Sequence, residues 1–194
     1  MRKLTMLATV STLVLAGGLA CGQKTGLNPR RPNPAVSFAG SDASPIPLAT
    51  SVNSMSATPA TIQFTANNPG SAVAGNSSAT VSWTINGGAS GNTWTLSVYA
   101  NSTAFSGCTT VPASAVGVSC SSASHTGTKP SATCQSGGPF TLPTTAPGQQ
   151  VASGNEGNSS SHTFTVVLNY QITDSWEYIA NTCPLTITYT VNAP

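Results

Sequence analysis

Charged side chains are nearly absent from this 194-residue sequence, which holds six lysines and arginines and four aspartates and glutamates. Five of the six basic residues lie before position 32, so the rest of the chain carries one lysine and four acids. A nucleic-acid partner requires a stripe of lysine and arginine that neutralises phosphates. The composition therefore predicts no nucleic-acid partner for the body of the chain.

A sustained apolar stripe at helical spacing is also lacking. In its place the sequence is rich in serine, threonine and asparagine, which together make up 69 of the 194 residues. Hydroxyl and amide side chains with little lysine or glutamate suit the exposed faces of strands and turns better than helices. The composition favours an all-β protein whose surface is kept wet by neutral polar groups.

Groups for metal or acid–base chemistry are few and scattered. His125 and His162 are the only two histidines, and no cysteine pair has the spacing of zinc ligands. Residues 154–158 could form a calcium loop, but Glu156 is the single carboxylate there, so a hairpin turn is the favoured interpretation. We expect no metal and no cofactor.

One hexapeptide, CQSGGP at residues 134–139, resembles the nucleophile loop of chymotrypsin-like serine proteases. In that family Gly-Asp precedes the serine, and the glycine amide helps to bind the oxyanion. Cys134 and Gln135 stand there instead, and no early histidine lies in an Ala-Ala-His-Cys context. We interpret Ser136 as part of a turn and predict that the protein is not an enzyme.

The N-terminus has the pattern of a secretory signal peptide at residues 1–20, with a basic start followed by an apolar stretch that is short for a membrane span. Cleavage after Ala20 would make Cys21 the first mature residue. The stretch LAGGLAC at 15–21 resembles a bacterial lipobox, with departures at the two positions before Ala20. The chain is predicted to be exported, and Cys21 is the candidate site for a lipid that would anchor it to the outer membrane. Without the lipid it would be extracellular.

Residues 21–44 are proline-rich and are predicted to form a flexible tether, with an end-to-end distance of roughly 25 Å. Residues 45–194 are predicted to form one domain, because apolar residues there alternate at period two between Gly/Asn/Ser turns. Alternation is clearest at residues 61–65, 79–86, 94–100, 116–120, 162–172 and 183–191.

Seven to eight short strands indicate an antiparallel β-sandwich or barrel, and an immunoglobulin-like sandwich is the favoured form. Trp83 and Trp94 share the phase of their aliphatic neighbours, so both are predicted to lie in the core. The marker arrangement of cysteines, tryptophan and tyrosine in true immunoglobulin domains is absent.

Five cysteines are an odd number for an exported protein, but only four follow Cys21. Cys108, Cys120, Cys134 and Cys183 could close as two disulfides in an oxidising compartment, with three possible connectivities. We favour Cys108–Cys120 as a hairpin link, which leaves Cys134 to pair with Cys183.

The segment Asp174-Ser175-Trp176-Glu177-Tyr178 gathers acids and aromatic rings at the end of the longest predicted strand. Asp174, Trp176, Glu177 and Tyr178 are candidate ligand-binding residues, because rings beside hydrogen-bonding acids can hold sugars. Tyr99, out of phase with its apolar neighbours, is a further candidate ring. The alternative is a structural corner in which Trp176 covers the end of the core.

The favoured function is that of a bacterial cell-surface module with a structural or adhesive role, whose partner is a glycan or a surface protein. A carbohydrate-binding module built around Trp176 is the second hypothesis. The third is a pilin-like subunit in which Ala35–Ala39 donates a strand to a neighbour.

Overall fold

The computed structural model describes residues 2–8, 51–66, 69–88, 90–178 and 183–193. The tether, Cys21, most of the predicted signal peptide and the first residues of the predicted domain lie outside this part of the chain. The described segments contain strands, turns and one short 3₁₀ helix, Ala113–Ala115. None of these segments contains a helix with the length and apolar character needed to span a membrane.

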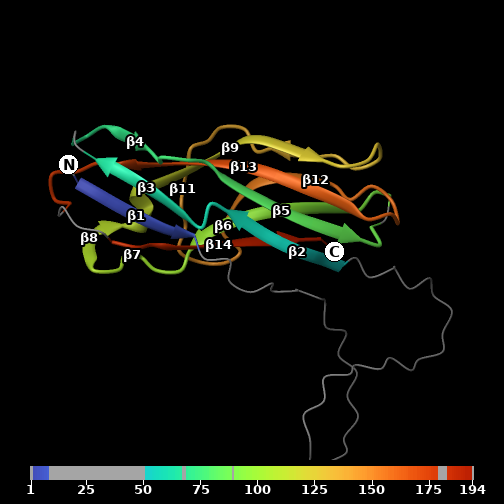
Figure 1. Ribbon diagram of the computed structural model, residues 1–194, viewed down its shortest axis with the longest axis horizontal. Coiled ribbons are helices and arrows are strands. Elements are labelled where there is room, and N and C mark those ends of the chain that lie inside the picture. Colours follow the sequence, from blue (N-terminus) through green and yellow to red (C-terminus); the bar gives the residue numbers. More distant parts are fainter. Residues whose placement is uncertain (1, 9–50, 67–68, 89, 179–182, 194) are drawn as a thin grey trace, which may run out of the picture.

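Most of the strands belong to two large sheets, whose long strands run along the long axis of the molecule (Figure 1). The first sheet has the order β10 (Thr133–Cys134), β12 (Gln149–Asn155), β6 (Thr93–Ala100), β14 (Thr186–Asn192), β1 (Arg2–Ala8) and β3 (Thr61–Ala66). The second has the order β11 (Phe140–Thr141), β9 (Val116–His125), β13 (His162–Thr173), β5 (Ala79–Asn86) and β2 (Ser51–Thr58), with β4 (Ala72–Ala74) also paired to β13. Short strands β7 (Ala104–Phe105) and β8 (Cys108–Pro112) form a separate pair.

Every neighbouring pair in these sheets is antiparallel except β1 and β14, which run parallel. The prediction of an all-β protein with antiparallel sheets is confirmed. Each of the six alternating segments in the sequence contains or overlaps an observed strand. Sequence periodicity missed β12, because its sequence QQVASGN has only two apolar side chains and a glycine.

The core lies between the two sheets. Trp83 of β5 and Trp94 of β6 are fully buried and meet edge to face with ring centroids 4.9 Å apart. Phe164 of β13 stacks on Trp83 at 5.7 Å and lies 5.1 Å from Trp94. Because these rings come from both sheets, their contact joins the layers, and the predicted core positions of both tryptophans are confirmed.

The predicted disulfide pairing was wrong, although all four cysteines do form disulfides. Cys108 is bonded to Cys183 with Cα atoms 5.8 Å apart, and Cys120 is bonded to Cys134 with Cα atoms 5.3 Å apart. The short sequence spacing of Cys108 and Cys120 was misleading because β8 pairs with β7, while β9 belongs to the second sheet. The Cys120–Cys134 bond joins β9 of the second sheet to β10 of the first.

The N-terminal strand differs from the sequence expectation. Residues 2–8 begin the predicted signal peptide, and in this structure they form β1 between β14 and β3 (Figure 1). Register pairs β1 with β3 from Arg2–Ala66 to Leu7–Thr61, and with β14 at Leu7–Thr186 and Ala8–Ile187. An apolar segment with alternating residues satisfies the requirements of a strand as well as those of a signal peptide.

Candidate functional site

The corner at residues 174–178 follows β13 directly and is fixed by its own backbone. The Asp174 N–H donates to the Ser71 carbonyl at 3.0 Å, and its carbonyl accepts from the Gly70 N–H at 2.9 Å. A turn follows, in which the Tyr178 N–H donates to the Ser175 carbonyl at 3.1 Å. The bonds of Asp174 attach the corner to the chain that precedes β4. The backbone that carries the corner side chains is therefore held by hydrogen bonds.

Trp176 and Asp174 point to different environments. Trp176 is 76% exposed and is the largest exposed hydrophobic side chain in the described part of the chain, whereas Asp174 is 2% exposed. Neither carboxylate oxygen of Asp174 has a hydrogen-bond partner within the described residues. The four candidate residues are therefore adjacent, but they do not form one shared ligand surface.

Tyr178 is the aromatic residue of the corner that packs against the core. Partial burial raises the pKa of its hydroxyl, and the negative charges of Asp174 and Glu177 raise it further. The alternative in which Trp176 covers the end of the core was wrong, because that ring stands in solvent. The exposed indole can stack on a flat apolar face, and the carboxylate of the exposed Glu177 beside it can accept a hydrogen bond.

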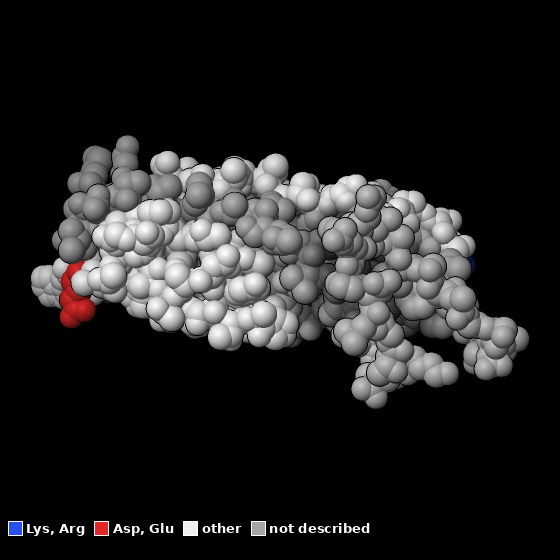
Figure 2. All heavy atoms as spheres, turned by 90° about the horizontal axis from the view of Figure 1, so that it is seen from below, with Lys and Arg blue, Asp and Glu red and all other residues white. Residues whose placement is uncertain are grey.

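On the face drawn in Figure 2, the charged atoms of the described residues lie at the two ends of the molecule. Acidic atoms lie at one end of the long axis and basic atoms at the opposite end, and the described residues drawn between them are uncharged. Among the acids whose side chains are described, Glu156 and Asp174 are buried and Glu177 is exposed. The described residues of this face form no charged surface that would steer a charged partner.

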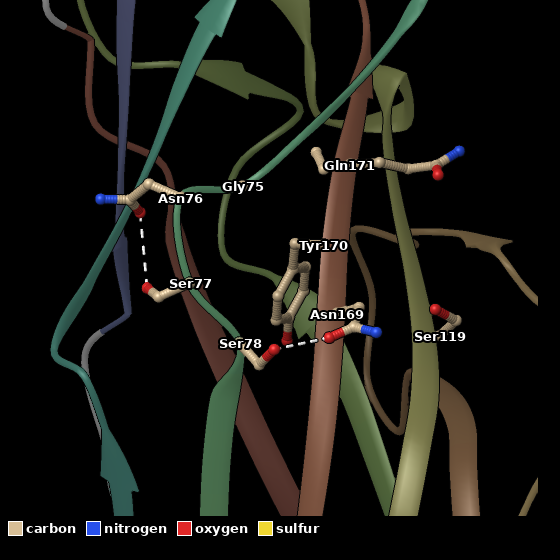
Figure 3. A pocket seen from close by; sticks show the side chains of 9 residues that line it. Gly75, Asn76, Ser77, Ser78, Ser119, Asn169, Tyr170 and Gln171 are labelled. Carbon is tan, nitrogen blue, oxygen red and sulfur yellow. Dashed lines mark hydrogen bonds between the residues drawn. The ribbon is translucent and has the colours of Figure 1, made fainter.

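A polar hollow of about 500 Å³ lies beside β13, lined by residues of the β4–β5 turn and by Ser119, Asn169 and Gln171 (Figure 3). Ser78 Oγ donates to Asn169 Oδ1 at 2.6 Å and Ser77 Oγ to Asn76 Oδ1 at 3.4 Å. Two pairs of lining side chains are therefore bonded to each other, and the described residues that line the hollow are uncharged. Sequence reasoning missed it, since its residues come from distant positions.

The other candidate residues have structural surroundings. Ser136 lies exposed at a bend beside Gly137, which has a positive φ of 91°, and no histidine contact to it occurs in the described residues. His162 is 6% exposed, and its ring nitrogens are 3.2 Å from the Thr126 carbonyl and 2.8 Å from Asn158 Oδ1. These contacts fix the ring in the β12–β13 turn region.

Two further candidate residues are not part of the corner: Tyr99 lies in the other sheet, and Glu156 lies inside the protein. Tyr99 of β6 is half-buried opposite Thr188 of β14 in the first sheet, whereas the corner follows β13 of the second. Glu156, in the loop suggested for calcium, is fully buried, and its N–H donates to the Asn92 carbonyl at 3.0 Å. Within the described segments no group of three histidine, cysteine or acidic residues could hold a metal ion.

The chain matches no model of a protein family, and neither a curated protein nor a solved structure was found to be similar to it.

Proposed function

We propose that the chain is an exported bacterial surface protein with a structural or adhesive, non-catalytic role. It is released or held at the outer membrane through a lipid on Cys21. The observation that carries the proposal is the closure of all four later cysteines into two disulfides. Such bonds persist in oxidising compartments outside the cytosol, which is where a signal peptide would deliver the chain.

The neutral surface supports a structural role. Hydroxyl groups face one another across strands, as in Ser82 with Thr165 at 3.1 Å and Thr84 with Thr163 at 3.4 Å. Such a surface binds water without attracting counter-ions, and it leaves the exposed Trp176 as an apolar contact point. A module of this kind can fill space, or adhere through one end, without any chemical step.

The proposal is tested by the intact mass of the protein recovered from its native host. The expected mass corresponds to a chain that starts at Cys21, with four hydrogens fewer than the reduced form, and with acyl groups if it is anchored. A chain that retains residues 1–20, or four free thiols in the folded protein, would contradict export.

We also propose that the two sheets form an immunoglobulin-like sandwich. The antiparallel sheets share a core of aromatic rings, which supports the proposal. An experimental structure of the mature chain tests it. Mean strand directions of the two sheets within about 30° of each other are expected, whereas crossing near 90° would assign an orthogonal packing.

A carbohydrate-binding role is the second candidate, and the exposure of Trp176 favours it. Stacking of a pyranose ring on this indole would be lost in Trp176→Ala and largely kept in Trp176→Phe. Because the side chain is 76% exposed, neither change should alter the fold. Affinity electrophoresis through a panel of polysaccharides measures the retention of all three proteins.

Retention that falls in Trp176→Ala and persists in Trp176→Phe supports the sugar-binding role. Lys129→Ala is a matched surface control, because it also changes an exposed residue but one that lies on the loop before β10. Equal migration of the parent protein in the presence and absence of every polysaccharide would eliminate this candidate.

A further inference from the structure

Strand β1 occupies a position that export would empty. It is the only strand that joins β3 to the rest of the first sheet in the described part of the chain, because the order there is β14, β1, β3. All of β1, Arg2–Ala8, lies inside the predicted signal peptide. If cleavage follows Ala20, the mature protein has the two flanking strands without the strand between them.

The edge of β3 that faces β1 requires a partner. The Gln63 N–H donates to Asn76 Oδ1 at 2.9 Å, and the Gln63 carbonyl accepts from the Asn76 N–H at 2.9 Å. Backbone N–H and C=O groups of successive residues in a strand point to opposite edges. Because those of Gln63 point toward Asn76, the backbone groups of Ile62 and Phe64 point toward β1. Register places Met6 opposite Ile62 and Leu4 opposite Phe64.

Loss of β1 would leave a gap rather than let the sheet close. Asn76 holds the other edge of β3, and the two-residue turn from β2 holds its first residue; both lie outside the signal peptide. Ile62 and Phe64 are fully buried in the present structure, so an empty gap would bring water to their apolar side chains and unpaired backbone groups. The gap therefore requires another strand.

The mature chain contains a segment of the required pattern. In Ala35–Ala39, the apolar Val36 and Phe38 alternate with Ser37, as Leu4 and Met6 alternate with Thr5 in β1. Two apolar side chains two residues apart match the spacing of Ile62 and Phe64 across the gap.

The segment can reach the gap within its own chain. Residues 40–50 span at most about 36 Å when extended. They must connect the end of the gap beside Thr61 to Ser51, and these points are separated by the length of the eight-residue β2, about 24 Å, and a two-residue turn. The connection is long enough for the segment to run in the same direction as β1.

We propose that Ala35–Ala39 replaces β1 between β3 and β14 of the same molecule after the signal peptide is removed. The inference rests on the proposed export of the chain. A tethered segment has an effective concentration of the order of millimolar, which exceeds that of a second copy at micromolar concentration about a thousandfold. The mature protein is therefore a self-completed monomer, and residues 21–34 remain as the tether.

Hydrogen exchange measured by mass spectrometry on the mature chain, residues 21–194 with both disulfides formed, tests the proposal. Amides of residues 36–39 and of Ile62 and Phe64 should exchange at least 100-fold more slowly than those of residues 23–28. Phe38→Asp places a charge on the face that meets the core and should abolish the protection of both segments. Ser37→Asp is the matched control with the same substitution on the opposite face, and it should retain protection.

Sedimentation velocity over a hundredfold range of concentration accompanies the exchange measurement. A monomer with both segments protected supports the proposal. Protection that appears only with dimers or longer assemblies assigns the segment to a second copy and overturns it, as does rapid exchange of residues 36–39 in the cleaved monomer. If the natural protein retains residues 1–20, β1 stays in its place, and both the export proposal and this proposal fail. Rapid exchange of residues 36–39, or protection only in assemblies, overturns this proposal alone and leaves the export proposal intact.

Discussion

Two tyrosine hydroxyls meet inside the core, one from each sheet. Tyr170 of β13 donates a hydrogen bond to Tyr189 of β14 at 3.1 Å, and both residues are buried. Burial raises the pKa of Tyr189 to about 12, with the hydrogen bond from Tyr170 acting in the opposite direction. Burial and then the neighbouring Tyr189 raise the pKa of Tyr170 well above its ordinary value.

These pKa values predict a loss of stability at alkaline pH. The folded pKa of each tyrosine lies above the unfolded value of about 10, so the unfolded chain releases its protons first. The contribution of the two tyrosines to the unfolding free energy is therefore complete below pH 10, and it is lost as the pH rises through about 12. Each tyrosine contributes a slope of up to about 1.4 kcal/mol per pH unit in that window. Urea unfolding followed by tryptophan fluorescence between pH 8 and 11.5 measures the slope.

The double variant Tyr170→Phe/Tyr189→Phe is the control for this prediction. It removes both hydroxyls and leaves neither unpaired, which limits its own cost in stability. Its unfolding free energy should change much less between pH 10 and 11.5. A slope as steep as that of the parent protein would show that other groups cause the alkaline effect.

At the scale of elements, the disulfides attach segments that the strand ladders do not connect. Cys120–Cys134 links β9 to β10 across the two sheets and closes 14 residues, whereas Cys108–Cys183 links β8 to the segment before β14 and closes 75 residues. Restriction of the unfolded chain grows with the logarithm of loop length. The second bond is therefore expected to stabilise the fold more.

Paired serine variants test this order. On the chain-entropy treatment, Cys108→Ser/Cys183→Ser lowers the unfolding free energy by about 4.5 kcal/mol and Cys120→Ser/Cys134→Ser by about 3 kcal/mol. Guanidinium unfolding of both variants and the parent protein measures the differences. A larger loss from the shorter loop would show that native packing around Cys120 outweighs chain entropy. Non-reducing peptide mapping of the parent protein should find these two links alone.

At the scale of the whole molecule, folding depends on apolar burial and neutral hydrogen bonds. The core draws side chains from both sheets, while the charged side chains of the described residues on the face shown in Figure 2 lie at the two ends. Salt at physiological concentration screens interactions between exposed charges at opposite ends of the long axis, because the Debye length is about 8 Å. Coulombic interaction between them adds little to stability.

Stability is therefore expected to be nearly independent of sodium chloride. The unfolding free energy at pH 7 should change by less than about 0.5 kcal/mol between 0.05 and 0.5 M salt, a range over which exposed charge pairs are screened. Urea titrations of the parent protein at each salt concentration measure it. Sodium sulfate serves as the positive control, because its exclusion from protein surfaces should raise stability. A loss above 1 kcal/mol in sodium chloride would reveal an ionic contribution that this fold does not account for.

The sequence by itself determined the class of the fold and much of its core. Alternation at period two depends only on neighbouring residues, so it located the strands that contain Trp83, Trp94 and Phe164 and predicted which faces would be dry. The count of cysteines after Cys21 likewise predicted two disulfides. Strand β12 escaped detection because its place in the sheet comes from pairing with β6 and β10, and hardly from its own apolar content.

Only the tertiary structure decided which cysteines meet and which corner residues share an environment. Cysteine spacing along the chain says little once β8 and β9 belong to different sheets. Adjacent residues at a corner can point in opposite directions, and this is why Asp174 is buried while Trp176 is exposed. The place of β1 between β14 and β3 follows the same logic, because strand order in a sheet is set by contacts between residues far apart in sequence.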